Sequence, residues 1–267
     1  MKIVTLIENL VQQTNYVAEH GLSLYIETGG HRLLFDTGLS GKFIDNAVKM
    51  GIDLAQVDAV VISHGHYDHA GGLNAFFEIN AKAKVYAQKS AFLPKFSRGF
   101  KYIGNETNAE VLAKRLIELN EVTEIVPGVY LFPQTKLFDR TDTNFKDFYF
   151  QEGDTKRPDE FDDEQFLVLK KNSEINILTA CSHRGITNVC ATAVEYFKLP
   201  VGMILGGFHI KDCPESQYQF MIEYLKRLAP KYIGVSHCTG VDKFARMMND
   251  CSAKVFYNQT GNEINLK

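Results

Sequence analysis

Ser63-His64-Gly65-His66-Tyr67-Asp68-His69-Ala70-Gly71-Gly72 follows directly on the apolar run Ala59-Val60-Val61-Ile62 and decides the fold of this chain. A short apolar run bounded by polar residues and glycine is typical of a buried strand. The pair Gly71-Gly72 lets the backbone turn tightly into the next helix. The sequence therefore predicts a buried strand that ends in a cluster of polar side chains.

Three histidines and a carboxylate are concentrated in this cluster. In an extended segment side chains alternate between faces, so we expect His64, His66 and Asp68 on one side, and His69 where the chain leaves extended geometry. Neutral imidazoles with one carboxylate are the usual ligands of zinc and its first-row neighbours. We predict one or two divalent metal ions, zinc first, with iron or manganese as alternatives. A polar loop with exposed histidines is the competing interpretation.

The composition of the 267 residues, 45% hydrophobic and 23% charged, is that of an ordinary globular protein. The formal net charge of −3 gives no overall basic field, which argues against sequence-independent binding of nucleic acid. Five cysteines without a C-x-x-C pair argue against a disulfide framework and against a zinc ribbon.

No apolar run approaches membrane-spanning length, and Glu8 interrupts the apolar start of the chain too early for the core of a signal peptide. We therefore expect a cytoplasmic protein without membrane contact. We also expect its partner to be a small-molecule substrate. The sequence leaves the oligomeric state open.

Apolar periodicity and turn residues predict an alternation of strands and helices. Four of the predicted strands end in loops that carry histidine or aspartate, which is expected when one edge of a layered sheet holds a site. Strands are predicted at 1–7, 22–28, 32–36, 58–62, 84–87, 129–132, 165–169, 175–179, 201–205, 232–235 and 254–257. Helices are predicted at 41–50, 73–79, 110–119, through 189–197, at 217–228 and at 244–248.

The segment 88–164 breaks this rhythm, because it is charged and aromatic and lacks an apolar repeat sufficient for a core of its own. We predict one domain over 1–267, with this segment as a surface excursion that covers the site. Within it, Lys95, Arg98 and Lys101 are interleaved with aromatic residues and are candidates to hold a phosphate. A solvated basic loop is the alternative.

The order His64-x-His66-x-Asp68-His69 resembles the signature of the metallo-β-lactamase superfamily, and the resemblance covers most of the chain. It implies an α/β fold, the four-layer αββα sandwich of that superfamily. It also implies two metal positions. The implied ligands are His64, His66 and His183 for the first metal and Asp68, His69 and His237 for the second.

One departure from the superfamily pattern lies at Gly206-Gly207-Phe208-His209, where an aspartate usually bridges the two metals. An imidazole does not bridge as a carboxylate does, so we expect His209 to be a terminal ligand or a catalytic group beside the metals. Loss of an anionic bridge leaves two dications less compensated, and we expect one metal to be lost readily. Cys238, next to His237, is an alternative ligand. We otherwise interpret Cys181 and Cys238 as small buried hydrophobic residues.

A narrower resemblance rests on Asn9, Glu19-His20-Gly21-Leu22-Ser23, Phe35-Asp36-Thr37-Gly38, the opening stretch, Cys181-Ser182-His183, Gly206-Gly207-Phe208-His209 and His237-Cys238-Thr239-Gly240. Together these segments are similar to the dihydropterin ribofuranosylaminobenzene-phosphate synthase-like branch of the superfamily. The similarity implies that Asp36 orients a ligand histidine by accepting its other ring proton. It also implies that Glu19 and His20 line the site. A turn carboxylate and a solvated loop are the respective alternatives.

These residues together predict a metal-dependent hydrolase, or a related group transferase, that uses a metal-activated water. Asp68 would orient that water or accept its proton. The predicted substrate is small, anionic or phosphorylated, and pterin-like. A di-iron oxidoreductase, a nuclease of the same superfamily and a non-catalytic binding or sensing protein are the competing functions.

Overall fold

The computed structural model describes residues 1–266, which form two compact units. Unit 1 contains residues 1–120 and 146–163 together with the described residues from Gln259 onward. Unit 2 contains residues 121–145 and 164–258. The single domain expected from the sequence stays a prediction. No helix within residues 1–266 combines the length and the apolar character needed to cross a membrane.

The main sheet of unit 1 has seven strands in the order β18-β1-β2-β3-β4-β5-β8. Strands β3, β4, β5 and β8 run parallel, whereas β18, β1, β2 and β3 pair antiparallel. Carboxyl ends of parallel neighbours meet at one sheet edge, which places the loops after β3 and β4 together. The strands are β1 (Lys2–Ile7), β2 (Ser23–Thr28), β3 (His31–Phe35), β4 (Ala59–Val61), β5 (Lys84–Tyr86), β8 (Leu116–Ile117) and β18 (Glu263–Asn265).

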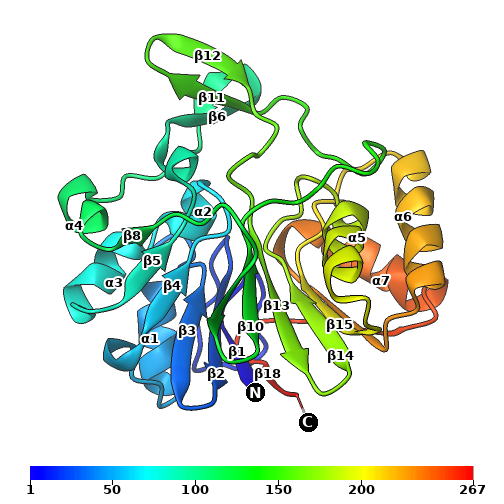
Figure 1. The fold of residues 1–267 in the computed structure, drawn as a ribbon, viewed down its shortest axis with the longest axis horizontal. Coiled ribbons are helices and arrows are strands. Elements are labelled where there is room, and N and C mark those ends of the chain that lie inside the picture. The colour runs from blue at the N-terminus through cyan, green and yellow to red at the C-terminus, as the bar shows by residue number, and fades with distance from the viewer. Residues whose placement is uncertain (267) are drawn as a thin grey trace. The chain divides into compact units, whose positions relative to one another are not determined.

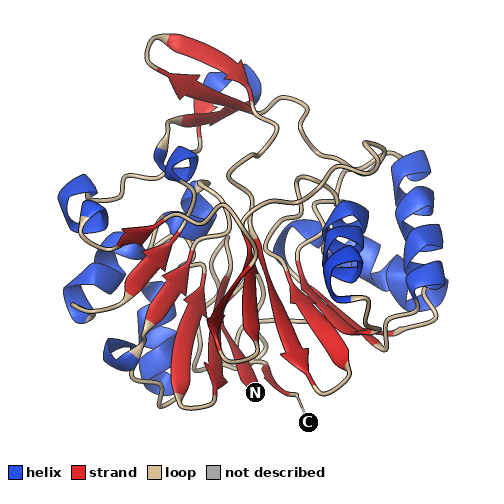
Figure 2. Cartoon of the chain, viewed as in Figure 1, coloured by secondary structure: helices blue, strands red, loops and turns tan. Residues whose placement is uncertain are grey.

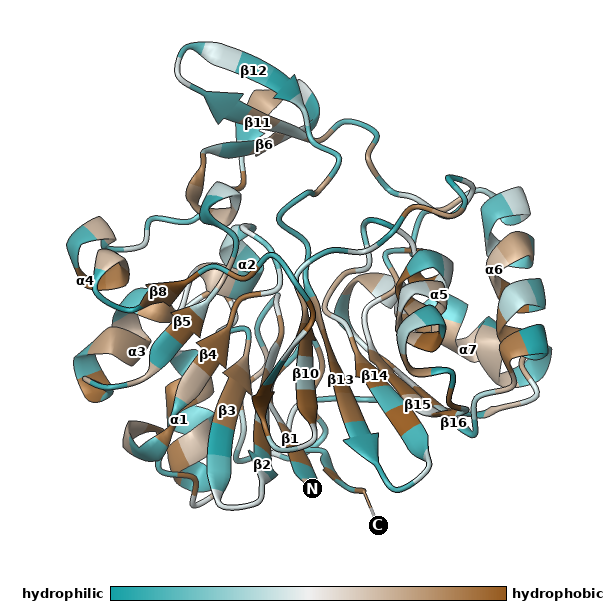
Figure 3. Cartoon of the chain, in the orientation of Figure 1, coloured by the Kyte–Doolittle hydropathy of each residue, from teal (hydrophilic) through white to brown (hydrophobic). Residues whose placement is uncertain are grey.

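Helices α1 (Lys42–Lys49) and α3 (Leu73–Ile79) cover the sheet of unit 1, as Figures 1 and 2 show. Their apolar faces pack on the strands, with Phe43 and Phe76 fully buried in one cluster with Leu34 and Val60. The chain is most apolar in these strands and polar in the loops beyond them (Figure 3). The short helices of this unit are α2 (Tyr67–Ala70) and α4 (Ala109–Ala113), with 3-10 turns η1 (Leu54–Gln56), η2 (Lys89–Phe92) and η3 (Arg98–Phe100).

The strands predicted at 22–28 and 32–36 are present, and they form an antiparallel hairpin. Strands β2 and β3 pair up to Thr28 opposite His31, with Gly29 and Gly30 between them at φ 57 and 85. Both glycines thus adopt the left-handed conformation that a two-residue hairpin turn requires.

Two local expectations in unit 1 are wrong. Asp68 does not continue an extended segment, because α2 begins at Tyr67 and places Asp68 and His69 on one helical turn. The helix expected over 110–119 ends at Ala113, and Leu116–Ile117 joins the sheet as β8 beside β5. Pairing with β5 outweighs the local helical pattern there, because strand propensity depends on its neighbours.

The excursion contributes a second, four-stranded sheet to unit 1, in the order β12-β11-β6-β7. Figure 1 shows β6, β11 and β12 at the end of the unit where α2 lies. The segment is less superficial than predicted, because Asp159 and Asp163 are 3% and 1% exposed. The strands are β6 (Lys95–Ser97), β7 (Lys101–Tyr102), β11 (Tyr149–Glu152) and β12 (Thr155–Pro158).

Unit 2 has a seven-stranded sheet in the order β17-β16-β15-β14-β13-β10-β9. Strands β14 to β17 run parallel, so the loops after β14, β15 and β16 lie along one edge. Helices α5, α6 and α7 pack on this sheet (Figure 1). The strands are β9 (Thr123–Val126), β10 (Val129–Phe132), β13 (Phe166–Lys171), β14 (Glu174–Leu178), β15 (Val201–Gly206), β16 (Tyr232–Val235) and β17 (Lys254–Tyr257). The helices are α5 (Ile186–Phe197), α6 (Glu215–Leu228) and α7 (Val241–Asp250), with the 3-10 turn η4 (His237–Thr239).

A carboxylate from a distant loop caps α5. Asp142 Oδ2 accepts a hydrogen bond from Thr187 N, and Asp142 Oδ1 accepts one from Thr187 Oγ1, both at 3.0 Å. Gly185 has φ +93, and a Cβ atom there would lie 1.8 Å from Asp142 Oδ1. Only glycine fits this approach, and the cap thereby holds the loop that carries His183 two residues earlier.

The Asp142 carboxyl group should make stability depend on pH. Burial raises its pKa to about 6, although hydrogen bonds from Thr187 oppose this shift. The folded protein then binds the proton more tightly than the unfolded chain. The resulting stabilisation is present below about pH 4 and is lost as the pH rises through the folded pKa. At ~1.4 kcal/mol per pKa unit, about 3 kcal/mol of the free energy of unfolding should be lost.

The variant Asp142→Asn cannot titrate, so this loss should be absent from it. Urea unfolding between about pH 4 and pH 7 would measure the difference. Equal pH slopes in the variant and in the unmodified protein would show that Asp142 has no such role.

Candidate metal centre

Asp36 organises the histidine cluster of unit 1 from the end of β3. Its Oδ1 atom accepts from Ser63 N at 2.6 Å, and its Oδ2 atom accepts from Ser63 Oγ at 2.7 Å. His69 Nδ1 lies 2.7 Å from the same Oδ2 atom. Asp36, Ser63 and His69 are fully buried. A buried carboxylate with three donors is well compensated, and it fixes both the loop after β4 and the ring of His69.

The hydrogen bonds around Asp36 also set the tautomers of two histidines. An ionised carboxylate only accepts, so His69 carries its proton on Nδ1 and a lone pair on Nε2. Ser63 Oγ donates to Asp36 and therefore accepts from His64 Nδ1, 2.9 Å away, which leaves the lone pair of His64 on Nε2. Burial and the neighbouring histidines hold the pKa of His64 well below its usual range. Neutral rings with Nε2 lone pairs are the form in which histidine binds metals.

The ring of His66 belongs to the same cluster and packs against two aromatic side chains. Its Nδ1 atom lies 3.1 Å from His64 Nε2. The His66 ring is 5.4 Å from the rings of both Phe148 and Phe161, between centroids. Phe161 is fully buried and also lies edge-on to His64. Sequence reasoning missed both phenylalanines, which restrict the His66 ring and keep water from one side of it.

Asp68 and His20 lie together, whereas Glu19 does not line the cluster as expected. His20 Nε2 is 3.1 Å from Asp68 Oδ2, and the His20 side chain is 55% exposed. Glu19 is buried, and its Oε1 atom accepts from the backbone of Leu39 and Ser40. Glu19 therefore holds the loop after β3, and of this pair only His20 reaches the carboxylate of the opening stretch.

Lys95 does not occupy the exposed position expected for it. Its side chain is 2% exposed, and Lys95 Nζ lies 2.8 Å from Asp159 Oδ2 and 3.0 Å from Asp163 Oδ1. Burial alone would lower the pKa of this ammonium group, but the carboxylates of Asp163 and Asp159 raise it, so it stays charged. Asp163 Oδ2 accepts from Gly65 N at 2.8 Å. This ion network supports the backbone between His64 and His66.

Arg98 and Lys101 remain at the surface of the small sheet. Arg98 is 84% exposed on its side chain and pairs with Asp147 at 3.0 Å. Lys101 is exposed in β7. Phe100 is 53% exposed, and Lys156 Nζ lies 4.6 Å from the centre of its ring. Arg98, Lys101 and Phe100 are thus exposed on the small sheet, with Lys156 over the ring of Phe100, and their binding of a phosphate stays a prediction.

In unit 2, His183 follows β14 and is fixed through its backbone. Its N atom donates to Glu164 Oε1 at 2.6 Å, and Arg184 N donates to Glu164 Oε2 at 2.9 Å. His183 Nδ1 lies 3.4 Å from Asn144 O. A carbonyl oxygen only accepts, so the lone pair of His183 is on Nε2, as in His64 and His69. The ring of His209 is 4.2 Å from that of His183 between centroids.

His237 and two cysteines lie along the same edge of unit 2. The ligand atoms of Cys181, His237 and Cys238 are all within 4.8 Å of one another, and so are those of Cys181, His183 and His209. Burial alone would raise the pKa of the Cys238 thiol, but hydrogen bonding around Cys181 and His209 and the charge of nearby His237 hold it well below its usual range.

Two supporting carboxylates were not found from the sequence. Asp163 and Glu164 are consecutive, and they bond the backbones of the Gly65 loop in unit 1 and the His183 loop in unit 2, respectively. Their only signal was the unusually acidic run 159–164, which is also typical of an exposed loop. Burial of both carboxylates reveals their role.

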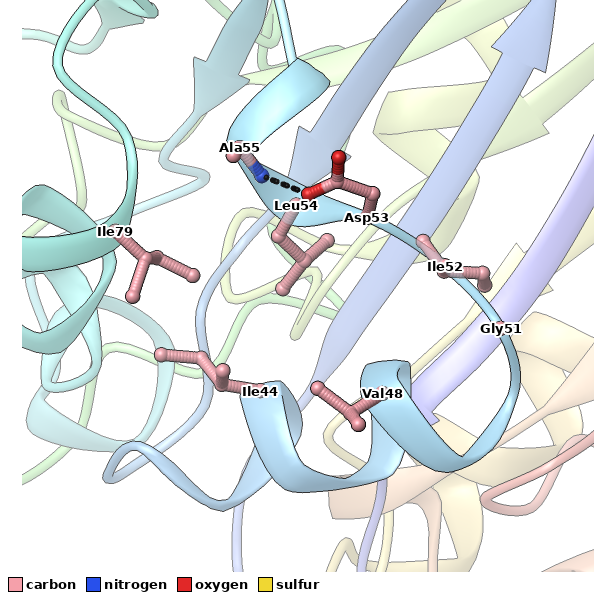
Figure 4. A pocket seen from close by; sticks show the side chains of 8 residues that line it. All are labelled: Ile44, Val48, Gly51, Ile52, Asp53, Leu54, Ala55 and Ile79. Carbon is pink, nitrogen blue, oxygen red and sulfur yellow. Dashed lines mark hydrogen bonds between the residues drawn. The ribbon is translucent and has the colours of Figure 1, made fainter.

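An apolar hollow of about 390 Å³ lies elsewhere in unit 1, between α1, η1 and α3 (Figure 4). Ile44, Val48, Leu54 and Ile79 line it, and its one carboxylate, Asp53, caps η1 through Ala55 N. Apart from Asp53, the residues that line the hollow carry no polar side chain, so it lacks the group of candidate ligands that the histidine loops contain.

Comparison with known proteins shows which family this chain is similar to. The family model of the metallo-beta-lactamase superfamily matches residues 17–156, just over half of the chain. An uncharacterized protein of Methanocaldococcus jannaschii is 31% identical over 260 residues, covering 91% of this chain and 93% of that protein. From the same organism, 7,8-dihydropterin-6-methyl-4-(beta-D-ribofuranosyl)-aminobenzene-5'-phosphate synthase is 28% identical over 260 residues, covering 90% of this chain and 88% of that protein.

A solved structure gives the same result at the level of the fold. The crystal structure of a metal-dependent hydrolase of the beta-lactamase superfamily matches this chain with a TM-score of 0.89 and 29% identity, covering 100% of this chain and 99% of that one. The predicted α/β fold of the metallo-β-lactamase type is thereby confirmed. Sequence and fold agree, and this chain belongs to the metallo-β-lactamase superfamily.

Proposed function

We propose that this protein is a metal-dependent hydrolase, or a related group transferase, that activates water at the histidine cluster. The observation that carries the proposal is the network around Asp36, which directs the Nδ1 protons of His69 and, through Ser63, of His64 away from the cluster. Two buried imidazoles whose Nδ1 protons point away from the cluster fit a divalent metal ion better than they fit a purely structural core.

The proposed ligands follow the superfamily order. Their assignment rests on motif position and on ring tautomers, which the local hydrogen bonds of each unit set independently. His209 replaces the usual bridging aspartate and is proposed as a terminal ligand or a proton-transfer group. The proposed sets are His64, His66 and His183 for the first metal and Asp68, His69 and His237 for the second.

A divalent ion in such a site lowers the pKa of a water molecule and polarises the bond to be broken. Asp68 is placed to accept a proton, because its Oδ2 atom is 3.1 Å from His20 Nε2 and 3.8 Å from His69 Nε2. Asn9 Nδ2 lies 3.3 Å from His20 Nδ1 and can only donate to it, so His20 Nε2 carries the ring proton and donates to Asp68, which orients this carboxylate. Phe148 and Phe161 limit the access of water to His66, which strengthens electrostatic interactions there.

The proposed substrate is a small anionic or phosphorylated molecule with a flat ring, such as a pterin. Arg98, Lys101 and the ring of Phe100 present cations and an aromatic surface on the small sheet of unit 1. The relative named as a dihydropterin ribofuranosyl-aminobenzene phosphate synthase makes this class the first to assay. Glu19 and Lys95 are left out of the proposed contacts, since their charged groups bond within the protein.

Removal of a ligand should abolish turnover without unfolding the protein. His64→Ala and Asp68→Ala should each lower kcat/KM by about 10³-fold or more, because several kcal/mol of transition-state stabilisation are lost. The matched control is His31→Ala, at the start of β3, whose side chain is 43% exposed. Turnover of a panel of phosphate esters, phosphodiesters and lactones by metal-replete protein gives the rates, and circular dichroism checks the fold.

Two results would contradict this function. Stoichiometric iron with a visible absorption band in protein purified without added metal would favour the di-iron oxidoreductase. No turnover of any member of the panel by fully metallated protein would favour a binding or sensing role.

A further inference from the structure

The carboxyl ends of β14, β15 and β16 lie side by side in unit 2, because these strands are parallel neighbours. The loops that follow β14 and β16 bring the ligand atoms of Cys181, His237 and Cys238 within 4.8 Å of one another. We propose that these two thiolates and this imidazole form one metal-binding set, so that the ion assigned above to His237 has sulfur ligands. The inference rests on the proposed function only in treating the chain as a metalloprotein.

The donor set matches a known zinc chemistry. Two cysteines and one histidine are a combination of protein ligands that holds zinc in known sites. Metal–ligand distances of about 2.0–2.3 Å place tetrahedral ligand atoms about 3.3–3.8 Å apart. Separations below 4.8 Å therefore need only small movements of the side chains. Thiolates are soft ligands, and they select zinc and other thiophilic ions over magnesium and manganese.

The absence of a side chain at Gly207 leaves room for the sulfur atom of Cys238. A Cβ atom at Gly207 would lie 2.6 Å from Cys238 Sγ and 2.4 Å from Ala180 O, so this position has no room for a side chain. His209 N donates to Cys238 Sγ at 3.3 Å, and the sulfur lies 3.7 Å from Cys181 O. Backbone groups of all three loops thus fix the sulfur at the carboxyl edge of the sheet.

The same three loops contain non-glycine residues with positive φ. Ser182, His209 and His237 have φ of 55, 49 and 51, although none of them is glycine. Non-glycine residues rarely adopt this left-handed conformation, and they keep it mainly where the surroundings impose it, as at ligand sites. Ser182 follows Cys181, and His237 precedes Cys238. The constrained backbone therefore lies at or next to each of the proposed ligands.

The other three cysteines behave as ordinary buried or half-buried residues. Cys190 lies on α5 and is fully buried in an apolar cluster, and Cys213 and Cys251 are half-buried near helix ends. Among residues 1–266, these three belong to none of the groups of side chains close enough to share a metal ion. They therefore provide matched controls within the same chain.

Cobalt substitution of the full-length protein tests the proposal by spectroscopy. Bound Co²⁺ shows visible d–d bands whatever its ligands, whereas a sulfur ligand adds a thiolate-to-cobalt charge-transfer band in the near ultraviolet. We expect both bands in the unmodified protein. The charge-transfer band should fall to about half in Cys181→Ser and in Cys238→Ser, vanish in the double variant, and be unchanged in Cys213→Ser.

The bands separate failure of this inference from failure of the proposed function. Visible bands without the charge-transfer band would overturn sulfur ligation and leave the histidine metal site standing. Absence of both bands would overturn both proposals. A charge-transfer band that persists in the double variant would assign the sulfur to another cysteine and overturn this set.

A measurement on the unmodified protein covers the case in which a variant does not fold. Alkylation of each thiol by iodoacetamide is followed by peptide mass spectrometry with and without Zn²⁺. Zinc should slow the alkylation of Cys181 and Cys238 by about 10-fold or more, and leave that of Cys213 unchanged. Equal effects of zinc on all three thiols would overturn the proposal.

Discussion

Replacement of Lys95 with methionine should lower the free energy of unfolding by about 3–5 kcal/mol. The carboxylates of Asp159 and Asp163 are buried, and Lys95 Nζ is within 3.0 Å of both. Without the ammonium group, two like charges remain in a poorly solvated place, and burial together with Asp163 already raises the pKa of Asp159. Urea unfolding followed by circular dichroism measures the loss.

Two further variants distinguish the effect of losing the Lys95 charge from the effect of changing a lysine side chain to methionine. Lys101→Met removes an exposed lysine from the same small sheet and should change the free energy of unfolding by less than ~0.5 kcal/mol. In Lys95→Met/Asp159→Asn/Asp163→Asn the charges are removed together, and much of the stability should return. A loss below ~1 kcal/mol in the single variant would show that water reaches these carboxylates.

Replacement of Asp36 with asparagine should lower the affinity for zinc by about 10–100-fold, the usual effect of losing a group that orients metal ligands. The amide has one acceptor oxygen in place of two, so it cannot hold Ser63 N, Ser63 Oγ and His69 Nδ1 at once. The ring of His69 then loses its fixed tautomer. Competition for zinc with a chromophoric chelator measures the affinity.

The matched control for Asp36 is Asp58→Asn. Asp58 accepts a backbone hydrogen bond from Arg32 at the opposite end of the same strands, and its side chain is 43% exposed. Its replacement should leave the zinc affinity unchanged. An unchanged affinity in Asp36→Asn would mean that His64 and His69 do not bind metal through the network described here.

Local pattern was sufficient for most of the secondary structure. Strands 129–132, 232–235 and 254–257 and helix 73–79 have the bounds expected from the sequence. Apolar side chains recur there with a period that belongs to one kind of element, and glycine or polar residues end each run. The expectation for 110–119 failed, because its last residues pair with β5, a partner that the local pattern does not reveal.

The candidate site, like the secondary structure, was predicted in part from the local sequence and in part revealed only by the structure. The opening stretch indicated His64, His66, Asp68 and His69 as ligands by residue type and spacing alone, and Asp36 was placed beside a ligand histidine by resemblance. The structure shows the contact of Asp36 with His69. It also shows that Asp68 and His69 lie on a helical turn, because α2 begins at Tyr67.

The sequence by itself determined most of the strands and helices outside the segment 88–164, and which of them is followed by a dense set of candidate metal ligands, because both depend on neighbours along the chain. Only the tertiary structure decided that Lys95 is buried with Asp159 and Asp163, and that Cys181 lies beside Cys238. These partners are more than fifty residues apart. Charge and polarity alone assigned Lys95 to the surface, whereas desolvation and ion pairing, which decide its position, depend on groups that only folding brings together.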